Sequence, residues 1–286
     1  MRGDRLKVDA SRELLLPAKP NHRVGRGIRW YARRLVRKRF HAVRIDPALP
    51  AILSSLESAD RPAIVLMTHS SWWDPIVGIL LWDRFYPERP IAGPMHRREL
   101  ERFGFFRSIG VFGIEPDDPA SLAAMREYVL PRMRRDGGRS GEVLMLTPQG
   151  SLADARAPIA IRPGAASIAA AFESIDVVAL AIEYGFWVDQ RPEIFLRAER
   201  CEPMARDRRA STADWHRAMQ DSMRRSAASL ADAVISRDPD RFEVLAGAGT
   251  SVHPVYDAWL RLIGRSGSID GDGRSRRESA TKAASR

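Results

Sequence analysis

Short apolar runs alternate with longer amphipathic segments along most of this chain. The runs have the length of buried strands, and the segments between them repeat their apolar residues at helical spacing. Strands are predicted at 42–45, 63–67, 90–95, 111–114, 143–147, 177–183 and 193–198. Helices are predicted at 27–44, 47–58, 75–85, 97–106, 119–135, 163–173, 212–236 and 254–263. This alternation indicates an α/β fold: a mixed, mostly parallel sheet flanked by helices, with an N-terminal amphipathic helix and C-terminal helices.

Composition divides the chain into three parts. Residues 1–45 begin with a polar, proline-containing arm to about residue 22, and the first predicted helix follows it. Residues 46–263 contain most of the predicted elements and are long enough to bury a large core. Residues 264–286 are rich in Ser, Gly and Arg, which predicts a disordered tail. We therefore expect one domain at 46–263 with a segment at either end.

The net charge of +10 is concentrated near the N-terminus. Nine Arg or Lys residues and no acidic residue lie between Asn21 and Ile45, while 46–263 carries 26 basic and 30 acidic residues. At helical spacing, apolar and aromatic residues share one face of the predicted helix, namely Ile28, Tyr31, Ala32, Leu35 and Val36. Basic residues surround that face, namely Arg29, Arg33, Arg37 and Lys38. Such a helix favours an anionic membrane surface, where each basic residue contributes about 1 kcal/mol.

Nucleic acid is the rival partner for this charge, and a docked helix with a solvated basic face is a third interpretation. The neutral-to-acidic remainder has no second basic stripe, which favours the membrane over nucleic acid. No apolar run reaches the roughly 20 residues of a transmembrane helix, and the N-terminus lacks the apolar stretch of a signal peptide. We expect a cytoplasmic protein, bound peripherally to the inner face of the cell membrane, with no nucleic-acid partner.

Cysteine and histidine are too scattered to suggest a metal or a disulfide. Cys201 is the only cysteine, and no Cys/His cluster has the spacing of a zinc site. We therefore expect no metal and no bound cofactor.

The strongest candidate for chemistry is a histidine and an aspartate separated by four residues, His69 and Asp74. The pair follows the predicted strand 63–67 and precedes Pro75, which is typical of the first turn of a helix. Reactive groups are common at such strand-to-helix junctions. A neutral imidazole can take a proton from a hydroxyl, and a carboxylate on its other nitrogen fixes the tautomer and stabilises the imidazolium. The alternative is two surface groups at a helix start, with Asp74 as the cap.

Three further blocks follow the His-x4-Asp block, namely Ser108–Glu115, Leu146–Gly150 and Val177–Ile182. In this order and at these distances, the four blocks resemble the glycerolipid acyltransferase family, of the lysophosphatidic acid acyltransferase type. In that family, His-x4-Asp is followed by a Gly-x-x-x-Ile-Asp-Arg block, a Phe-Pro-Glu-Gly-Thr-Arg block and an apolar Val-Pro strand. The resemblance covers roughly residues 60 to 190.

The resemblance implies a fold, a reaction and a set of site residues. The domain at 46–263 would be an acyltransferase domain that moves a fatty acyl group from acyl-CoA or acyl carrier protein to a hydroxyl of a lipid, by default a lysophospholipid, in phospholipid biosynthesis. His69 and Asp74 would be the catalytic residues. The expected substrate-binding residues are Pro148, Gln149, Gly150, Glu115, Arg156, Arg162, Trp72 and Trp73.

Several positions depart from the family's blocks. Pro116 and Leu152 stand where the family has arginines, which would hold the acceptor's phosphate by bidentate contacts. Ala179 stands where the last block has proline. Arg156 and Arg162 lie just downstream and could substitute, or they belong to a solvated loop. The acceptor is therefore expected to differ from a simple glycerol phosphate, and a glycosylated lipid or carotenoid glycoside is an alternative to the lysophospholipid.

Other mechanisms remain open alongside direct base catalysis by His69. Donors near Gly150, such as backbone N–H groups of the turn after Pro148, would stabilise the oxyanion. An asparagine in place of Asp74 would slow the reaction by leaving His69 in the wrong tautomer. A nucleophilic Ser70 or Ser71 would make the protein a hydrolase, although the chain has no Gly-x-Ser-x-Gly motif. A non-catalytic lipid-binding member of the fold is the remaining alternative, although such a protein would need neither catalytic residue.

Two aromatic groups are candidates for contact with lipid. Trp72 and Trp73 lie between the base and its partner, and they either pack in the core or line an acyl groove or membrane interface. The second group is Phe103, Phe105 and Phe106, for which core packing is the alternative.

Overall fold

The centre of the molecule is one mixed sheet. The computed structural model describes residues 14–59, 61–134, 141–187, 189–204 and 209–247, and its eight strands have the order β4-β3-β5-β2-β6-β7-β1-β8. The strands are β1 Ala42–Ile45, β2 Ala63–Met67, β3 Ile91–His96, β4 Val111–Ile114, β5 Val143–Leu146, β6 Asp176–Gly185, β7 Glu193–Arg200 and β8 Glu243–Gly247. Neighbours pair in parallel except β6 with β7 and β1 with β8. The predicted α/β fold with a mostly parallel sheet is confirmed.

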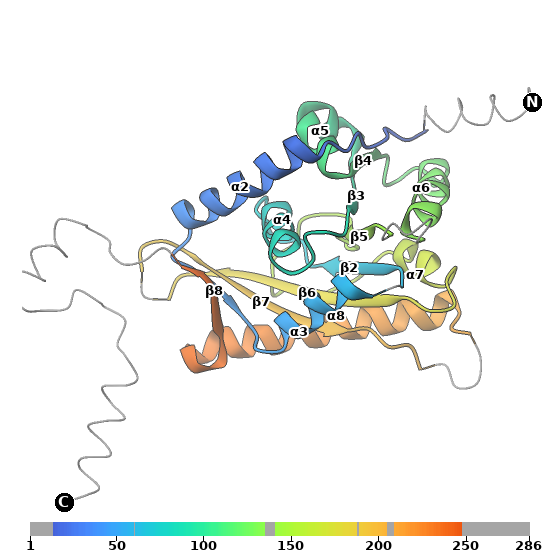
Figure 1. Cartoon of the computed structure of the whole chain (residues 1–286). Coiled ribbons are helices and arrows are strands. Elements are labelled where there is room, and N and C mark those ends of the chain that lie inside the picture. The colour runs from blue at the N-terminus through green and yellow to red at the C-terminus, as the bar shows by residue number, and fades with distance from the viewer. Residues whose placement is uncertain (1–13, 60, 135–140, 188, 205–208, 248–286) are drawn as a thin grey trace, which may run out of the picture.

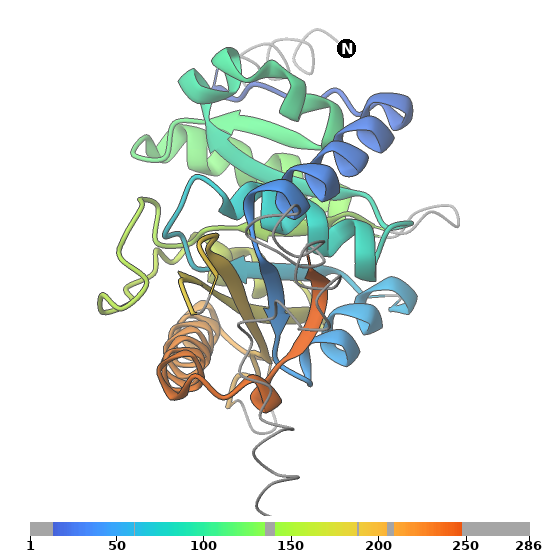
Figure 2. The ribbon, with the colours of Figure 1, turned by 90° about the vertical axis from the view of Figure 1, so that its left-hand side faces the viewer.

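Helices cover both faces of the sheet (Figures 1 and 2). They are α2 His22–Arg39, α3 Leu49–Ser58, α4 Asp74–Phe85, α5 Arg97–Arg102, α6 Pro119–Met133, α7 Gly164–Ala169 and α8 Thr212–Ser236, with 3-10 helices at Gly104–Ile109 and Pro239–Arg241. Side chains from α2, α3 and α4 pack in one core, and those from α6, α7 and α8 pack in another. None of the described helices has both the length and the apolar composition needed to cross a membrane.

The alternation of side chains along β2 explains the two cores. Val65 and Met67 face the core with α4, whereas Ile64 and Leu66 face the core with α6 and α7. A central parallel strand covered on both faces is apolar at every position. The functional groups at the carboxyl end of β2 therefore start from a rigid, fully buried strand.

The prediction of a loose N-terminal arm up to about residue 22 is wrong for the part that the structure describes. The described part of the arm is anchored to the edge strand β4, because Leu16 and Gly113 exchange two backbone hydrogen bonds of 2.9 and 2.7 Å. Leu15 is buried in the core with α6 and α7. An edge strand offers unpaired backbone groups, and this arm satisfies some of them.

Two predicted boundaries differ near the ends of the sheet. The helix expected at 27–44 runs from His22 to Arg39, since Asn21 caps it and β1 begins at Ala42. Because β1 lies between β7 and β8, the sheet includes four residues that the sequence placed in the N-terminal segment. The helix expected at 254–263 and the tail at 264–286 lie outside the described residues.

Candidate active site

The turn between β2 and α4 carries the His-x4-Asp block, and we call residues 68–74 the His–Asp turn. Thr68, the first residue of this turn, is hydrogen-bonded to β6. The Thr68 N–H donates to the Leu180 carbonyl at 3.0 Å, and the Thr68 Oγ1 accepts from the Ile182 N–H at 2.9 Å. Thr68 is buried. The turn therefore leaves the sheet at a fixed place beside β6.

His69 and Asp74 form a hydrogen-bonded pair. His69 Nδ1 lies 2.8 Å from Asp74 Oδ2, the side chain of Asp74 is completely buried, and that of His69 is 24 % exposed. An ionised carboxylate only accepts, so Nδ1 of the neutral imidazole carries the proton and Nε2 keeps its lone pair. Within the described parts of the chain, no residue hydrogen-bonds to Nε2. The ring therefore presents a base to its surroundings.

The carboxylate of Asp74 is held by four donors. Besides the imidazole, Oδ2 accepts the backbone N–H groups of Ser70 and Ser71, each at 2.9 Å, and Oδ1 accepts the Tyr184 hydroxyl at 2.6 Å. A buried charge is tolerated when its oxygens are satisfied in this way. The alternative of two solvated groups at a helix start is wrong for this pair, because Asp74 is buried and bonds to the turn.

Tyr184 is a site residue that the sequence did not reveal. It lies on β6 beyond Leu180, the partner of the last residue of β2, so its hydroxyl reaches the His–Asp turn. Burial raises the pKa of Tyr184 well above its usual range, and the negative charge of Asp74 raises it further. The hydroxyl therefore stays protonated and donates to Asp74. No motif marks this position, and the predicted strand at 177–183 ends one residue before it, whereas β6 continues to Gly185.

The loop at 147–153 packs against the His–Asp turn. Gln149 Oε1 accepts the His69 N–H at 2.9 Å, and the Ala153 N–H donates to the His69 carbonyl at 2.8 Å. The Gly150 N–H donates to the Thr147 carbonyl at 3.1 Å, so this backbone group is not free to stabilise an oxyanion as the sequence suggested. The backbone N–H of His69 can only donate, so the side-chain oxygen of Gln149 must face it. The side-chain NH2 of Gln149 therefore points away from this N–H. The described residues offer that NH2 no partner, so it is a free donor beside His69.

Arg162 lies between the two blocks in which Pro116 and Leu152 replace the family's arginines. Its guanidinium Nη1 donates to the Pro116 carbonyl at 2.8 Å and to Asp117 at 2.9 Å, and the side chain is about half exposed. It also crosses Gly150, where a Cβ atom would lie 2.6 Å from its Nε and where φ is +76°. A glycine is therefore required at position 150. Arg162 thus brings a positive charge to the turn where the family has its own arginine.

The two other charged candidates lie elsewhere. Arg156 pairs with the buried Glu183 at 2.7 Å. Successive residues of a strand point to opposite faces, so this pair and Tyr184 lie on different faces of β6. Glu115 faces His96 at 3.5 Å, and both side chains are about half exposed. The structure brings neither Arg156 nor Glu115 into contact with the His69–Asp74 pair.

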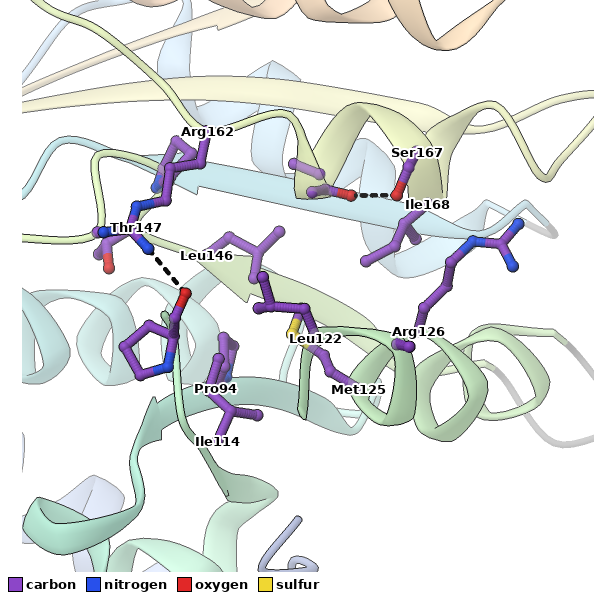
Figure 3. A pocket seen from close by; sticks show the side chains of 16 residues that line it. Pro94, Ile114, Leu122, Met125, Arg126, Leu146, Thr147, Arg162, Ser167 and Ile168 are labelled. Atoms are coloured by element: carbon purple, nitrogen blue, oxygen red, sulfur yellow. Dashed lines mark hydrogen bonds between the residues drawn. The ribbon is translucent and has the colours of Figure 1, made fainter. Parts of the chain in front are cut away.

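A cavity of about 310 Å³ opens beside the loop, between α6, α7 and the carboxyl ends of β3, β4 and β5 (Figure 3). Its wall is mainly apolar and includes Pro94, Ile114, Leu122, Met125, Leu146 and Ile168. Arg162 and Arg126 mark its two ends in Figure 3. Pro148 and Gly150 belong to the wall, so the cavity adjoins the loop that bonds to His69.

The remaining residues of the His–Asp turn differ in their surroundings. Trp72 is 58 % exposed, whereas Trp73 packs its ring at 4.9 Å from Phe40. Ser70 Oγ is buried without a hydrogen-bond partner, and Ser71 Oγ accepts the Trp73 N–H. Neither serine hydroxyl is bonded to His69, which argues against a serine nucleophile. Of the second aromatic group, Phe106 is buried and Phe105 is half exposed.

These features combine an α/β fold, a hydrogen-bonded His69–Asp74 pair at the end of a central strand, and an apolar cavity that adjoins the loop contacting His69. The model of the Acyltransferase family matches residues 43–183, which contain the pair, Gln149 and Arg162. This part of the chain is an acyltransferase domain, and the protein is an enzyme that transfers acyl groups. The match supports the resemblance to glycerolipid acyltransferases. No curated protein matches the chain.

Proposed function

We propose that the protein moves a fatty acyl group from an acyl thioester, acyl-CoA or acyl carrier protein, to a hydroxyl of a lipid acceptor of the lysophospholipid type. The observation that carries this proposal is the His69 imidazole, which Asp74 holds at Nδ1 while Nε2 remains free. A base in this state takes a proton from a hydroxyl without any covalent enzyme intermediate. A protein that only binds lipid has no need of such a pair.

The reaction runs in two proton transfers through His69. Nε2 takes the proton of the acceptor hydroxyl as its oxygen attacks the thioester carbonyl, and a tetrahedral oxyanion forms. The buried carboxylate of Asp74 stabilises the imidazolium. The free NH2 of Gln149 donates to the oxyanion, a contribution of the kind that preorganised donors make. When the C–S bond breaks, the imidazolium returns the proton to the thiolate, and the products are an ester and a free thiol.

The apolar cavity is the proposed seat of the acyl chain. Its lining is mainly apolar, and its wall includes the loop that contacts His69. An acyl chain there would be removed from water, which supplies binding energy in proportion to the apolar area covered. The acyl group would thus be held close to the base.

The acceptor is proposed to be a larger lipid with a free hydroxyl, rather than lysophosphatidic acid or glycerol 3-phosphate. Leu152 is exposed and cannot pair with a phosphate, and Asp117 already neutralises the charge of Arg162. A lipid whose polar part is a sugar, such as a carotenoid glycoside, belongs to the same proposal because it needs no phosphate site.

Helix α2 is the proposed contact with an anionic membrane surface. The apolar face predicted from the sequence packs on the domain, where Ala32 and Val36 are buried, so the proposed contact is the outward side. That side carries exposed aromatic and basic residues, namely Trp30, Tyr31, Arg34, Arg37 and Lys38. The helix ends at Arg39, and the ring of the next residue, Phe40, packs on Trp73 of the His–Asp turn. Its basic end therefore lies next to the site, so membrane binding would bring the site close to lipid. Such an enzyme would work on the cytoplasmic face of the membrane.

The test is release of free thiol from palmitoyl-CoA with a mixed lipid extract as acceptor, with the acylated product identified by mass spectrometry. His69→Ala should lower the rate by about 10²–10⁴, because general-base catalysis contributes that factor. The matched control is His216→Ala on α8, which should keep wild-type activity. Near-full activity of His69→Ala would refute the assignment, and absence of lipid-dependent thiol release by the wild type would favour a binding protein.

A further inference from the structure

We propose that Tyr184 is a positioning residue of this reaction, which holds the carboxylate of Asp74 in place for His69. Its hydroxyl donates to Oδ1 at 2.6 Å, while Oδ2 faces Nδ1 of the imidazole at 2.8 Å. Among the described residues, the hydroxyl of Tyr184 bonds to Asp74 and not to the imidazole. The inference rests on the proposed function, because it assigns Tyr184 a role in the base catalysis of His69.

The sheet brings Tyr184 to the site by extending β6 past its neighbour. β2 ends at Met67 opposite Leu180, and β6 continues to Gly185 while paired with β7. Leu180 and Ile182 face the core that α4 covers, and the alternation of the strand gives Tyr184 the same side. Asp74 is the first residue of α4, so its carboxylate meets the tyrosine hydroxyl at the end of that core.

The surroundings hold the phenol ring in one place. Tyr184 is paired across the sheet with Ile194, which is completely buried, and its ring centroid lies 6.0 Å from that of Phe40. Phe40 in turn packs on Trp73. A ring confined by neighbours on a strand can direct its hydroxyl with little loss of conformational entropy on each turnover.

The Tyr184 hydroxyl is important because the hydrogen-bond donors are divided unequally between the two oxygens of the Asp74 carboxylate. From the described residues, Oδ2 receives three hydrogen bonds and Oδ1 receives one, from Tyr184. Asp74 is completely buried, so water does not replace a missing donor at Oδ1. Without the phenol, more of the negative charge would rest on Oδ2, and the carboxylate would lose the contact that fixes its second oxygen. The imidazolium of His69 would then be stabilised in the resting enzyme, while the geometry of the pair would be less well defined.

Few other charges face this pair. His69 and Tyr184 are the titratable groups in contact with Asp74, from the turn and from β6. Glu183 is the next residue of β6, but it lies on the opposite face and pairs with Arg156. Trp73 and Phe40 cover the site from the turn and from the end of α2, and neither titrates. A change in pH dependence after loss of the Tyr184 hydroxyl would therefore report on the catalytic pair.

The test compares Tyr184→Phe with Tyr86→Phe by the palmitoyl-CoA assay across pH 5–9. Tyr86 is a matched control, because it is a completely buried tyrosine in the same core whose hydroxyl makes, among the described residues, one hydrogen bond, to the sulfur of Met145 at 3.8 Å. For Tyr184→Phe we expect kcat to fall about tenfold with KM unchanged, since the hydroxyl orients a catalytic group and touches no substrate. The acidic limb of the kcat profile should move to higher pH by about half to one unit, the equivalent of one hydrogen bond. Tyr86→Phe should show neither change.

Two outcomes would overturn the proposal: a wild-type kcat and pH profile for Tyr184→Phe, or an equal loss in both variants with the acidic limb unmoved, which would indicate a structural role. Failure of this inference is distinguishable from failure of the proposed function. If His69→Ala is inactive and Tyr184→Phe is normal, only the role of Tyr184 is wrong. If His69→Ala is active, the assignment of the base itself is wrong.

Discussion

Asp74→Asn keeps the shape of the catalytic carboxylate and removes its charge, so it measures what that charge contributes. The backbone N–H groups of Ser70 and Ser71 both point at Oδ2 and can only donate. The oxygen of the asparagine must therefore take the place of Oδ2, and its NH2 must face Tyr184. The tyrosine hydroxyl can rotate to accept from that NH2. The two backbone N–H groups and Nδ1 of His69 still donate to an oxygen, and the Tyr184 hydroxyl keeps a hydrogen bond at this position as an acceptor.

This geometry changes the reason for which Asp74→Asn is expected to lose catalytic activity. The sequence alone predicts that an asparagine leaves His69 in the wrong tautomer. In the structure the two backbone donors impose the correct orientation of the amide, so the tautomer is retained. What disappears is the charge that stabilises the imidazolium. The variant should therefore keep part of the catalysis that His69→Ala loses.

The size of the loss follows from the two kinds of hydrogen bond. A bond to a charged group contributes about 1.5–3 kcal/mol and a neutral one about 0.5–1.5 kcal/mol, so the difference is about 1–2 kcal/mol. Because about 1.4 kcal/mol is a factor of ten in rate, kcat should fall about 5- to 30-fold. Asp74 is completely buried and unscreened, which places the expectation at the upper end of this range. His69→Ala should cost about 10²–10⁴ in the same assay.

The measurement is kcat for thiol release by wild type, Asp74→Asn and His69→Ala, with the melting temperature of each variant as a check of the fold. Asp74→Ala is the contrast, since it leaves the Tyr184 hydroxyl and two backbone N–H groups without their acceptor and should lower the melting temperature. Asp74→Asn should melt close to the wild type. The reasoning fails if folded Asp74→Asn is as inactive as His69→Ala, or if it is as active as the wild type.

Two further predictions concern the partners. Lysophosphatidic acid and glycerol 3-phosphate should be poorer acceptors than a larger lipid with a free hydroxyl. The variant Arg162→Ala tests this, with Arg126→Ala at the other end of the cavity as its control. If the wild type uses lysophosphatidic acid efficiently and only Arg162→Ala loses this activity, the phosphate site has moved and the acceptor proposal is contradicted. Neutralising Arg34, Arg37 and Lys38 together by glutamine should weaken sedimentation with anionic vesicles about a hundredfold, since each charge contributes about 1 kcal/mol. Equal binding of the wild type to neutral and anionic vesicles would contradict the electrostatic part of the membrane proposal.

The fold was predictable wherever a strand is buried on both faces. The strand at Ala63–Met67 was predicted with the observed bounds, because a central parallel strand is continuously apolar. By contrast, β8 at Glu243–Gly247 was not predicted. It lies at the edge of the sheet, and its residues are exposed or half-buried, so its sequence carries no apolar run or clear alternation. The antiparallel pairing of β6 with β7 likewise depends on the whole sheet and on no local signal.

The site was predictable where its contacts are local. His69 and Asp74 lie on one turn, so their spacing alone was enough to suggest the pair. Tyr184 reaches Asp74 across a separation of 110 residues, and Arg162 reaches Pro116 across 46. Contacts of this kind are set by the order of strands and by loop packing, which no spacing in the sequence encodes. The motif therefore identified the hydrogen-bonded pair, while the residues that contact it from distant parts of the chain came only from the structure.

Gln149 shows how the departures from the family pattern combine in one site. A glutamate, the family's residue at this place, could accept the His69 N–H as well as the glutamine does, so the contact with His69 does not require an amide. The amide adds two donors on the side away from that contact, and it removes a negative charge from the neighbourhood of a developing oxyanion. Meanwhile Arg162 is paired with Asp117. The positive charge of Arg162 beside the loop is thus partly offset by a carboxylate, while the amide of Gln149 adds donors close to His69. This redistribution keeps the requirements of acyl transfer and weakens those of phosphate binding, which supports an acceptor recognised by something other than a phosphate.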